Sequence, residues 1–513
     1  MRYGFAIDQR TCIGCHACTV ACKTEHKVPV GQFRTWVKYI DSGSWPSSTR
    51  AFGVMRCNHC TDAPCVEICP TKALFKREDG IVDFDSERCI GCKSCMQACP
   101  YDAIYIDEDT HTAAKCNFCA HRVDDGLEPA CVVVCPTRSI WAGDLDDPES
   151  GISRLIAQHP TATRAPEQHT GPNVFYLGAN PAVLDPLLAP VADSYLWAQP
   201  DRHRLAVSED LVVDEATGAR TSLNTAHPRP WGWRVTTYLW TKGVGSGAVL
   251  VTAGALIAGL PAEGVLKVAA PAIGVGLTAV TGVLLVWDLK RPERFWYIFA
   301  KPNPKSWLFL GSVCLAGFGA VAGTWLAAAL GESAGLLSPA TFGRLLGLLR
   351  WLAVPSAAAA AGYTAFLFGQ AEGRDLWQSR LLLPHLLVQA VQGGSGVLLA
   401  LSAALGQGSL TRALAGTFVA SSAANLATLA AEYGRKHETP QAETATRMVT
   451  RGRYAKRFWA GAVGLGAAGA VLAAPAIRGR KLRRAAVGGL IGQVALLIYE
   501  SVFVRAGQDV PLS

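Results

Sequence analysis

Sixteen of the seventeen cysteines lie before residue 136, in four groups of four. The first and third groups share the spacing x2, x2, x3, whereas the second is spaced x2, x4, x3 and the fourth x2, x11, x3. Thiols gathered in this way bind metal or pair as disulfides, and their spacing helps to distinguish the two. The four groups are Cys12, Cys15, Cys18, Cys22; Cys57, Cys60, Cys65, Cys69; Cys89, Cys92, Cys95, Cys99; and Cys116, Cys119, Cys131, Cys135.

The third group, "CIGCKSCMQACP", has the C-x2-C-x2-C-x3-C-P spacing of bacterial ferredoxins. Three thiolates two residues apart can surround one face of a [4Fe–4S] cluster, while the fourth points towards a different cluster. Gly14 and Gly91 stand where the backbone must approach inorganic sulfur, and glycine has no Cβ to obstruct it. The proline after the last three groups keeps the preceding cysteine out of helical geometry. We therefore expect clusters in pairs, and four [4Fe–4S] clusters in all.

Zinc and disulfides are the alternatives to iron and sulfur. Zinc also binds four cysteines, but its sites usually separate two C-x2-C pairs by a longer spacer. Disulfides need an oxidising compartment. The N-terminus, "MRYGFAIDQRTC", has no apolar signal region and no twin-arginine pair, which favours a metal framework.

Residues 1 to about 190 resemble the four-cluster electron-transfer subunits of molybdopterin oxidoreductases, such as the iron–sulfur subunits of dimethyl sulfoxide, polysulfide and thiosulfate reductases. The matching text is "CIGCHACTVACKTEHKVPVGQFRTWV", "CNHCTDAPCVEICPTKALFKREDGIV", "CIGCKSCMQACPYDAIYID" and "KCNFCAHRVDDGLEPACVVVCPTRSIWAGDLDDPES". The resemblance implies nested ligand sets, none of which lacks a cysteine here. These sets are Cys12, Cys15, Cys18, Cys135; Cys22, Cys116, Cys119, Cys131; Cys57, Cys60, Cys65, Cys99; and Cys69, Cys89, Cys92, Cys95.

We expect residues 1–190 to form an α+β, double-ferredoxin-like iron–sulfur domain. Short alternating pieces, "GIVDFD" and "AIYIDED", predict strands of small hairpins. Because clusters would replace much of the side-chain core, the apo form should fold poorly. Residues 191–235 are polar and contain proline, and we interpret them as an extended linker that leads into the membrane.

The chain is 50% hydrophobic, and after about residue 235 alanine, glycine, leucine and valine dominate in long runs. A hydrocarbon layer of about 30 Å needs roughly 20 apolar helical residues to cross it. The pattern therefore predicts that residues 236–513 form an all-α polytopic membrane domain with eight transmembrane helices. The predicted spans lie near residues 243–262, 266–287, 306–330, 345–369, 381–404, 409–431, 458–476 and 485–504.

Eight spans place both ends of the chain on one side of the cell (inner) membrane. The loops on that side carry more lysine and arginine, so the positive-inside rule puts the iron–sulfur domain in the cytoplasm. The alternative is the exported face, because relatives of this domain can be exported with a partner that carries the signal. The net charge of +8 comes without an interleaved basic and aromatic stripe, which gives no indication of nucleic-acid binding.

Residues 231 to 505 resemble the polysulfide reductase membrane-subunit family, usually called NrfD. The matching stretches are "WGWRVTTYLWTKGVGSGA", "VWDLKRPERFWYIFAKPNPKSWLFLG" and "GYTAFLFGQAEGRDLW". Members are quinone-reactive anchors without haem, so the resemblance implies quinone or menaquinone as an exchangeable substrate. His385 is the only histidine within a predicted span, so we expect no haem.

Polar residues at membrane depth are candidates for the quinone site. A quinol needs hydrogen-bond partners for its two oxygens, and its oxidation releases two protons that a carboxylate, histidine or tyrosine can accept. Tyr238 resembles a tyrosine near the quinone pocket of the family. The candidates are Tyr238, Asp288, Arg291 and His385.

Each candidate also has a purely structural interpretation. Asp288 and Arg291 could pair with each other at the membrane interface, and His385 could bond to a neighbouring helix. Glu500, close to the end of the last predicted span, is expected to extend its carboxylate towards water.

The sequence thus predicts an electron-transfer and quinone-reactive membrane-anchor subunit. Neither part contains a molybdopterin site or a substrate-reducing centre beyond the quinone site, so we expect a separate molybdopterin-containing catalytic subunit as partner. Two alternatives stay open, a subunit of a redox-driven ion-translocating complex and a redox-sensing membrane protein.

Overall fold

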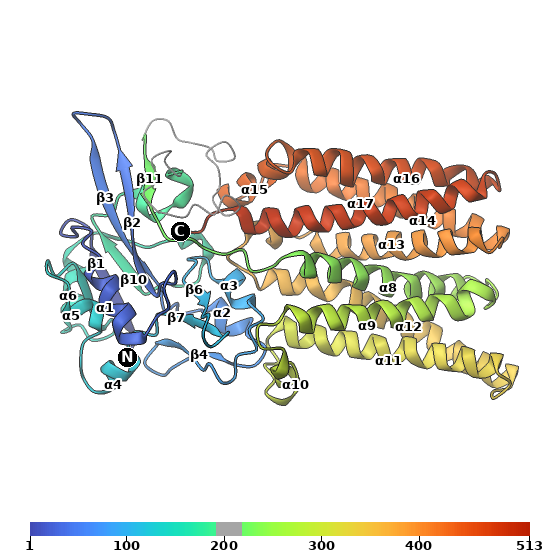
Figure 1. Cartoon of the computed structure of the whole chain (residues 1–513), viewed down its shortest axis with the longest axis horizontal. Coiled ribbons are helices and arrows are strands. Elements are labelled where there is room, and N and C mark those ends of the chain that lie inside the picture. The colour runs from blue at the N-terminus through green and yellow to red at the C-terminus, as the bar shows by residue number, and fades with distance from the viewer. Residues whose placement is uncertain (191–217) are drawn as a thin grey trace.

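The computed structural model describes residues 1–190 and 218–513. An N-terminal part of short strands and helices lies at one end of a long helical bundle, and the C-terminus returns to this N-terminal part (Figure 1). The predicted order, an α+β domain followed by an all-helical one, is confirmed.

A mixed sheet closes the N-terminal part by joining its two ends. Its central strand β1 (Tyr3–Asp8) pairs in parallel with β10 (Val174–Leu177) and antiparallel with β8 (Ile140–Asp144). The fourth strand, β9 (Thr161–Ala162), pairs with β10. Phe5, Ala6 and Ile7 are fully buried, as expected of a strand that is covered on both faces.

A second sheet forms a long hairpin that projects from the N-terminal part (Figure 1). β2 (Thr35–Ser42) pairs antiparallel with β3 (Thr49–Arg56) over its whole length. The third strand, β11 (Arg220–Leu223), comes from the segment before the bundle and pairs with β2. The chain between β11 and the bundle therefore stays attached to the N-terminal part until the first long helix begins.

Two small hairpins lie between the cysteine groups, where the sequence predicts them. β4 (Leu74–Lys76) pairs with β5 (Val82–Phe84), and β6 (Ile104–Ile106) pairs with β7 (Ala113–Lys115). Short helices begin within or beside the cysteine groups. They are α1 (Ala17–His26), α2 (Pro64–Glu67), α3 (Ser94–Ala98), α4 (Ala120–Asp124) and α5 (Ala130–Val133).

Two further short helices complete the N-terminal part. They are α6 (Gly151–Gln158), which packs on β8, and α7 (Pro181–Leu184), which packs on β2 and β3. Regular elements here are brief, and the buried side chains include most of the cysteines.

Seven helical segments of the described residues are long and apolar enough to cross a membrane. Each coincides with one of the predicted spans. They are Val265–Asp288 (ending in α9, Ala270–Asp288), α11 (Trp307–Ser333), α12 (Pro339–Gly369), α13 (Leu382–Ala404), α14 (Gly408–Tyr433), Arg457–Arg478 (containing α16, Leu465–Ala473) and α17 (Leu482–Asp509).

The first predicted span differs from the other seven. α8 (Trp233–Ile257) lies in the bundle against α9 and α13, but it is not among the seven helices that are apolar enough. It begins at Trp233 rather than near residue 243 because its polar side chains bond to neighbouring helices. Thr241 bonds to Thr281 of α9 at 2.7 Å, and the Lys242 Nζ donates to the Ala361 carbonyl of α12 at 2.8 Å.

α8 and α13 approach each other closely at glycine positions. A Cβ at Gly247 would lie 1.7 Å from the Ala390 carbonyl oxygen, and one at Gly394 would lie 2.1 Å from the Gly247 carbonyl carbon. Small residues at helix crossings allow such close backbone contact in membranes. This crossing fixes α8 against the rest of the bundle.

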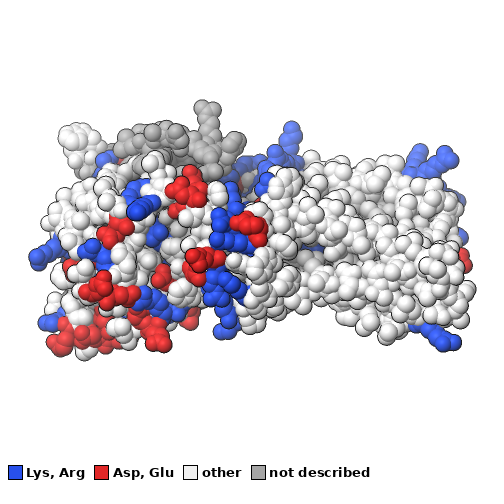
Figure 2. Space-filling model, turned by 60° about the horizontal axis from the view of Figure 1, so that its bottom comes forward, with Lys and Arg blue, Asp and Glu red and all other residues white. Residues whose placement is uncertain are grey.

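Charged side chains are unevenly distributed along the molecule (Figure 2). On the face shown, lysine, arginine, aspartate and glutamate gather over the N-terminal part and reappear at the far end of the bundle, whereas the intervening bundle surface is almost free of charge. A band of this kind is typical of helices that are embedded in lipid.

Candidate functional site

All seventeen cysteines are free thiols, and of these Cys15 is exposed. Burial is the main cause that raises the pKa of Cys12, and the neighbouring Cys135 and Cys15 raise it further. Burial likewise raises the pKa of Cys22 to about 12, and the neighbouring thiols Cys131 and Cys119 raise it further.

The second and third cysteine groups show the same pattern. Burial raises the pKa of Cys60 to about 12, and Cys57 and Cys99 are the thiols that add to it. Burial raises the pKa of Cys92 to about 12, with Cys69 as the leading neighbouring thiol. We number the four nested sets site 1 (Cys12, Cys15, Cys18, Cys135), site 2 (Cys22, Cys116, Cys119, Cys131), site 3 (Cys57, Cys60, Cys65, Cys99) and site 4 (Cys69, Cys89, Cys92, Cys95).

Thiols of different sets lie within electrostatic reach of one another, and these neighbours indicate how the sets follow each other in space. Cys131 of site 2 raises the pKa of Cys18 of site 1. Cys57 of site 3 in the same way raises the pKa of Cys116 of site 2. Cys65 of site 3 raises the pKa of Cys95 of site 4. These neighbouring thiols are consistent with the order site 1, site 2, site 3, site 4.

The two ends of the row have different surroundings. At site 1, Cys15 and Ile13 are exposed. Site 4 lies against the helical bundle, where the Lys290 N–H donates to the Gly91 carbonyl at 3.2 Å. The Asn303 side chain donates to the Cys69 carbonyl at 2.9 Å. One end thus faces the outside of the molecule and the other faces the membrane part.

The residues at site 4 fit a [4Fe–4S] cluster. Its four cysteines line one small hollow. The N–H groups of Gly91 and Ala113 donate to the Cys89 Sγ at 3.4 and 3.3 Å, as is common around cluster sulfur. Gly91 has φ +69°, and a Cβ there would lie 2.6 Å from the Lys290 Cβ, so only glycine lets the loop pass.

Buried polar atoms beside the cysteines also indicate an additional group. The His59 Nε2 and the Arg56 Nη2 are buried without a partner among the described residues, which is costly unless something else accepts their hydrogen bonds. Among the described residues, no group of three or more His, Cys, Asp or Glu is close enough to hold a single metal ion. A cubane does not need such a group, because each of its irons takes one cysteine.

Asp288 lies at the end of α9 and faces site 4. Its Oδ2 accepts from the Lys93 Nζ at 2.7 Å, and its Oδ1 is 4.0 Å from Arg234. Lys93 belongs to the loop between Cys92 and Cys95. Arg291 instead contacts Glu293 at 2.9 Å, so the expected alternative of an Asp288–Arg291 pair is not seen.

The other two candidates lie deeper in the bundle. The Tyr238 hydroxyl is buried within electrostatic reach of Asp288, Tyr363 and Glu500. The His385 Nε2 bonds to the Asn425 Oδ1 of α14 at 2.8 Å, which is the structural interpretation foreseen for it. The structure thus places Asp288 within electrostatic reach of Tyr238, whereas Arg291 pairs with Glu293 and His385 bonds to α14.

A small cavity in the bundle was missed from the sequence. Its lining is mostly apolar, but it includes Lys242 of α8, Gln389 of α13 and Glu500 of α17. Glu500 is only 5% exposed, so the prediction that it extends towards water is wrong. The reason is that α17 continues to Asp509, which leaves Glu500 well inside the helix. Both amide atoms of Gln389 are buried without a partner among the described residues.

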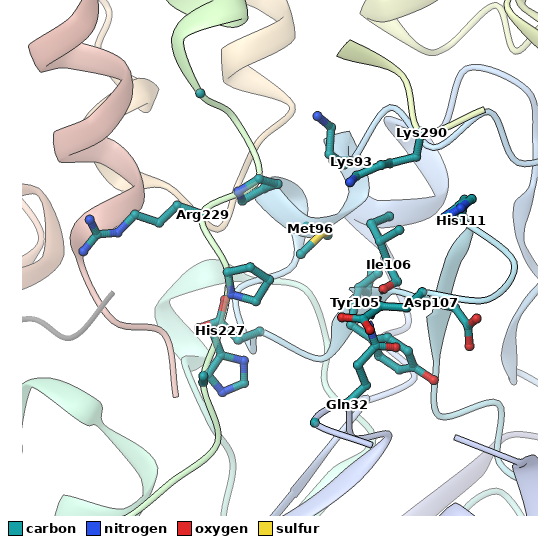
Figure 3. Close-up of a pocket in the computed structure, with 18 of the residues that line it drawn as sticks. Gln32, Lys93, Met96, Tyr105, Ile106, Asp107, His111, His227, Arg229 and Lys290 are labelled. Atoms are coloured by element: carbon teal, nitrogen blue, oxygen red, sulfur yellow. Dashed lines mark hydrogen bonds between the residues drawn. The ribbon is translucent and has the colours of Figure 1, made fainter. Parts of the chain in front are cut away.

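A larger cavity of about 840 Å³ lies at the junction of the two parts (Figure 3). Lys93 and Lys290 lie close together on one side, and the segment that carries His227 and Arg229 passes along the other (Figure 3). Asp288 also lines this cavity. The carboxylate of Asp288 is therefore in contact with a polar space outside the bundle.

Family models match both parts of the chain. The model "Polysulphide reductase, NrfD" matches residues 221–510, and the model "4Fe-4S dicluster domain" matches residues 49–145. The two models match separate parts of the chain, which agrees with a fusion of two kinds of subunit.

Curated relatives match the N-terminal part. One of the subunits of tetrathionate reductase from Salmonella typhimurium is 46% identical over 202 residues, which cover 39% of this chain and 80% of the relative. One of the polypeptides of polysulfide reductase from Wolinella succinogenes is 42% identical over 177 residues, covering 34% of this chain and 93% of the relative. The arsenate respiratory reductase iron-sulfur subunit ArrB of a Shewanella species is 36% identical over 227 residues, covering 34% of this chain and 96% of the relative.

These matches agree with the row of cysteine sites at one end of a multi-pass helical bundle. The N-terminal part is an iron–sulfur electron-transfer domain of the kind found in these reductase subunits. The chain belongs to the polysulphide reductase NrfD family, with that iron–sulfur domain fused ahead of its membrane domain.

Proposed function

We propose that the chain relays electrons between the membrane quinone pool and a separate molybdopterin-containing catalytic subunit through four [4Fe–4S] clusters. The observation that carries the proposal is the row of four cysteine sites, which runs from the exposed Cys15 to the bundle beside Asp288. In this proposal residues 1–190 are the electron-transfer domain, residues 191–235 the linker, and residues 236–513 the membrane domain. α8 is the first of its eight spans and adds to the seven named above.

Sites 1 to 4 each hold one cluster, which supplies a one-electron centre when bound. The thiols of the chain are its contribution to the ligand shell. Because burial raises the pKa of thiols such as Cys22 and Cys60 to about 12, they would be protonated at neutral pH without metal. Cluster binding therefore displaces protons, and it contributes directly to the folding of this domain.

The proposed quinone site lies at the end of the bundle next to site 4, with Tyr238 and Asp288 as the groups that contact quinol. One quinol gives up two electrons, which leave singly towards site 4, and two protons. Asp288 accepts the two protons one after the other and passes each to the junction cavity that it lines. Arg291 holds the end of α9 to the site 4 loop, since its N–H donates to the Ile90 carbonyl at 3.2 Å. His385 orients α13 through Asn425.

The catalytic partner docks at the opposite end of the row, around Ile13 and Cys15, where a cluster edge can approach another protein. The reductase subunits that this domain is similar to support a partner of the molybdopterin class. We place the iron–sulfur domain on the cytoplasmic face of the cell membrane, on the basis of the excess of lysine and arginine in the loops at that end. The exported face is the alternative.

The test uses membranes that contain the full chain. Addition of a menaquinol analogue should reduce the iron–sulfur clusters, measured by electron paramagnetic resonance, before any catalytic partner is added. Clusters that respond to dithionite but never to quinol would refute the quinone-linked relay and would favour the redox-sensing alternative.

A second candidate is a subunit of a redox-driven ion-translocating complex. The observation that favours it is the internal cavity with Lys242, Gln389 and Glu500, because charged groups buried at membrane depth mark ion pathways. Proteoliposomes distinguish the two. Quinol oxidation by an external acceptor releases the protons of quinol itself, which sets the baseline pH change. A change of lumen pH larger than this baseline is expected only if the protein also translocates ions.

A further inference from the structure

Arg56 is a buried cation without a carboxylate partner. It is the last residue of β3, it is 0% exposed, and two of its guanidinium nitrogens have no hydrogen-bond partner among the described residues. Its guanidinium lies 4.4 Å from the centroid of the Phe5 ring. An unpaired charge in such a place is strongly destabilising, so its surroundings must carry negative charge.

Thiolates are the counter-charge that the structure offers. The Arg56 Nη1 donates to the Cys131 Sγ at 3.2 Å. Cys131 and Cys116 of site 2 and Cys18 of site 1 are the groups whose charge raises the pKa of Arg56 against the opposing effect of burial. Arg56 therefore contacts the ligand shell of site 2, and Cys18 of site 1 lies within its electrostatic reach.

We propose that Arg56 raises the reduction potentials of the clusters at sites 1 and 2, an inference that rests on the four-cluster relay proposed above. Reduction adds one negative charge to a cluster that is already anionic. A buried cation stabilises the reduced state more than the oxidised state, and a hydrogen bond to a ligating sulfur acts in the same direction. One electron arrives and one leaves, no bond forms or breaks, and no proton moves.

Two cations near the membrane end have carboxylate partners. Lys93, in the loop of site 4, is paired with Asp288 at 2.7 Å. Arg374, whose pKa is influenced by Cys99 of site 3, has Asp102 at 3.6 Å. Their charges are offset by carboxylates, whereas that of Arg56 is offset by thiolates.

The test is a redox titration of the full-length, cluster-loaded chain, followed by electron paramagnetic resonance. In Arg56→Gln we expect two of the four cluster potentials to move to lower values while the other two stay at wild-type values. The matched control is Arg50→Gln on the same strand. Arg50 is 45% exposed and paired with Asp41, so this variant should leave all four potentials unchanged.

The conservative variant Arg56→Lys separates charge from shape. It keeps the cation but loses the fork geometry, and it should retain all four clusters with a smaller downward shift than Arg56→Gln. If Arg56→Gln loses iron, retention of iron in Arg56→Lys supports the role of charge. Equal loss of iron in both variants would overturn the proposal.

Wild-type protein distinguishes a failure of this inference from a failure of the proposed function. Fewer than four cluster signals in the wild type would refute the four-cluster relay itself. Four signals with unchanged potentials in Arg56→Gln would leave that relay intact and would refute the role of Arg56.

Discussion

At the scale of single residues, cysteine spacing is a stronger sequence signal for a cluster site than scattered polar residues are for the proposed quinone site. Cysteine spacing reflects local chemistry, because the loops that surround a cluster are short and must follow its shape. Asp288 and Lys93, in contrast, are 195 positions apart in the chain, and their 2.7 Å contact depends on how the two parts dock. Nothing in the local sequence around Lys93 signals a partner in the membrane domain.

Asp288 provides the most direct residue-scale prediction. Asp288→Asn keeps the shape of the side chain but removes a base, so quinol-dependent cluster reduction should slow by about a hundredfold or more. Reduction by dithionite, which does not use the quinone site, should remain normal. Stopped-flow absorbance of the clusters measures both rates.

Glu293→Gln is the matched control, because Glu293 lies on the same loop but is exposed and contacts only Arg291 among the described ion pairs. Normal quinol turnover in Asp288→Asn would remove Asp288 from the proposed site.

Glu372 gives a prediction about pH. Burial, followed by the neighbouring Glu67 and Asp62 carboxylates, raises the pKa of Glu372 from 4.5 to about 7. Between these two pKa values the folded chain binds a proton that the unfolded chain releases. The stability that protonated Glu372 contributes to the folded state is therefore fully present below pH 4.5 and is lost as the pH rises through about 7. Glu372→Gln should flatten the dependence of the melting temperature on pH across the interval between these two pKa values. Parallel profiles for the two proteins would contradict the prediction.

At the scale of elements, seven of the eight predicted spans agree with helices that are apolar enough to cross a membrane. Long runs of alanine, leucine and valine identify those helices without knowledge of their neighbours. The exception, α8, is stabilised by contacts that a sequence does not display, such as the bond of Lys242 to the Ala361 carbonyl. The same limit explains Glu500, whose burial depends on the helix continuing to Asp509.

The crossing of α8 and α13 supplies a prediction at this scale. Gly247→Ala places a methyl group against the Ala390 carbonyl and should lower stability by about 1–3 kcal/mol, because the two helices must move apart. Thermal unfolding of the purified protein in detergent measures the loss.

Gly243→Ala, on the same helix, is the control, since nothing lies within 4 Å of the added methyl group. Equal melting temperatures for both variants would show that the crossing tolerates separation.

At the scale of the whole molecule, the iron–sulfur domain and the bundle should depend on metal to different extents. Loaded protein should contain about sixteen irons per molecule, roughly four for each cubane. Removal of the clusters should unfold the N-terminal part, whose regular elements are short, and leave the bundle helical. Iron analysis and limited proteolysis, with mass analysis of the fragments, measure both effects. A zinc-filled protein that is inert to dithionite would contradict the cluster assignment.

The strand β11 has a consequence for how the two parts stay together. It is hydrogen-bonded into the sheet with β2, and only residues 224–232 separate it from the first turn of α8. A tether this short holds the two surfaces at an effective concentration in the millimolar range. Extraction into detergent and strong dilution should therefore not separate the relay from its anchor, and every copy of one is matched by a copy of the other without regulated co-expression.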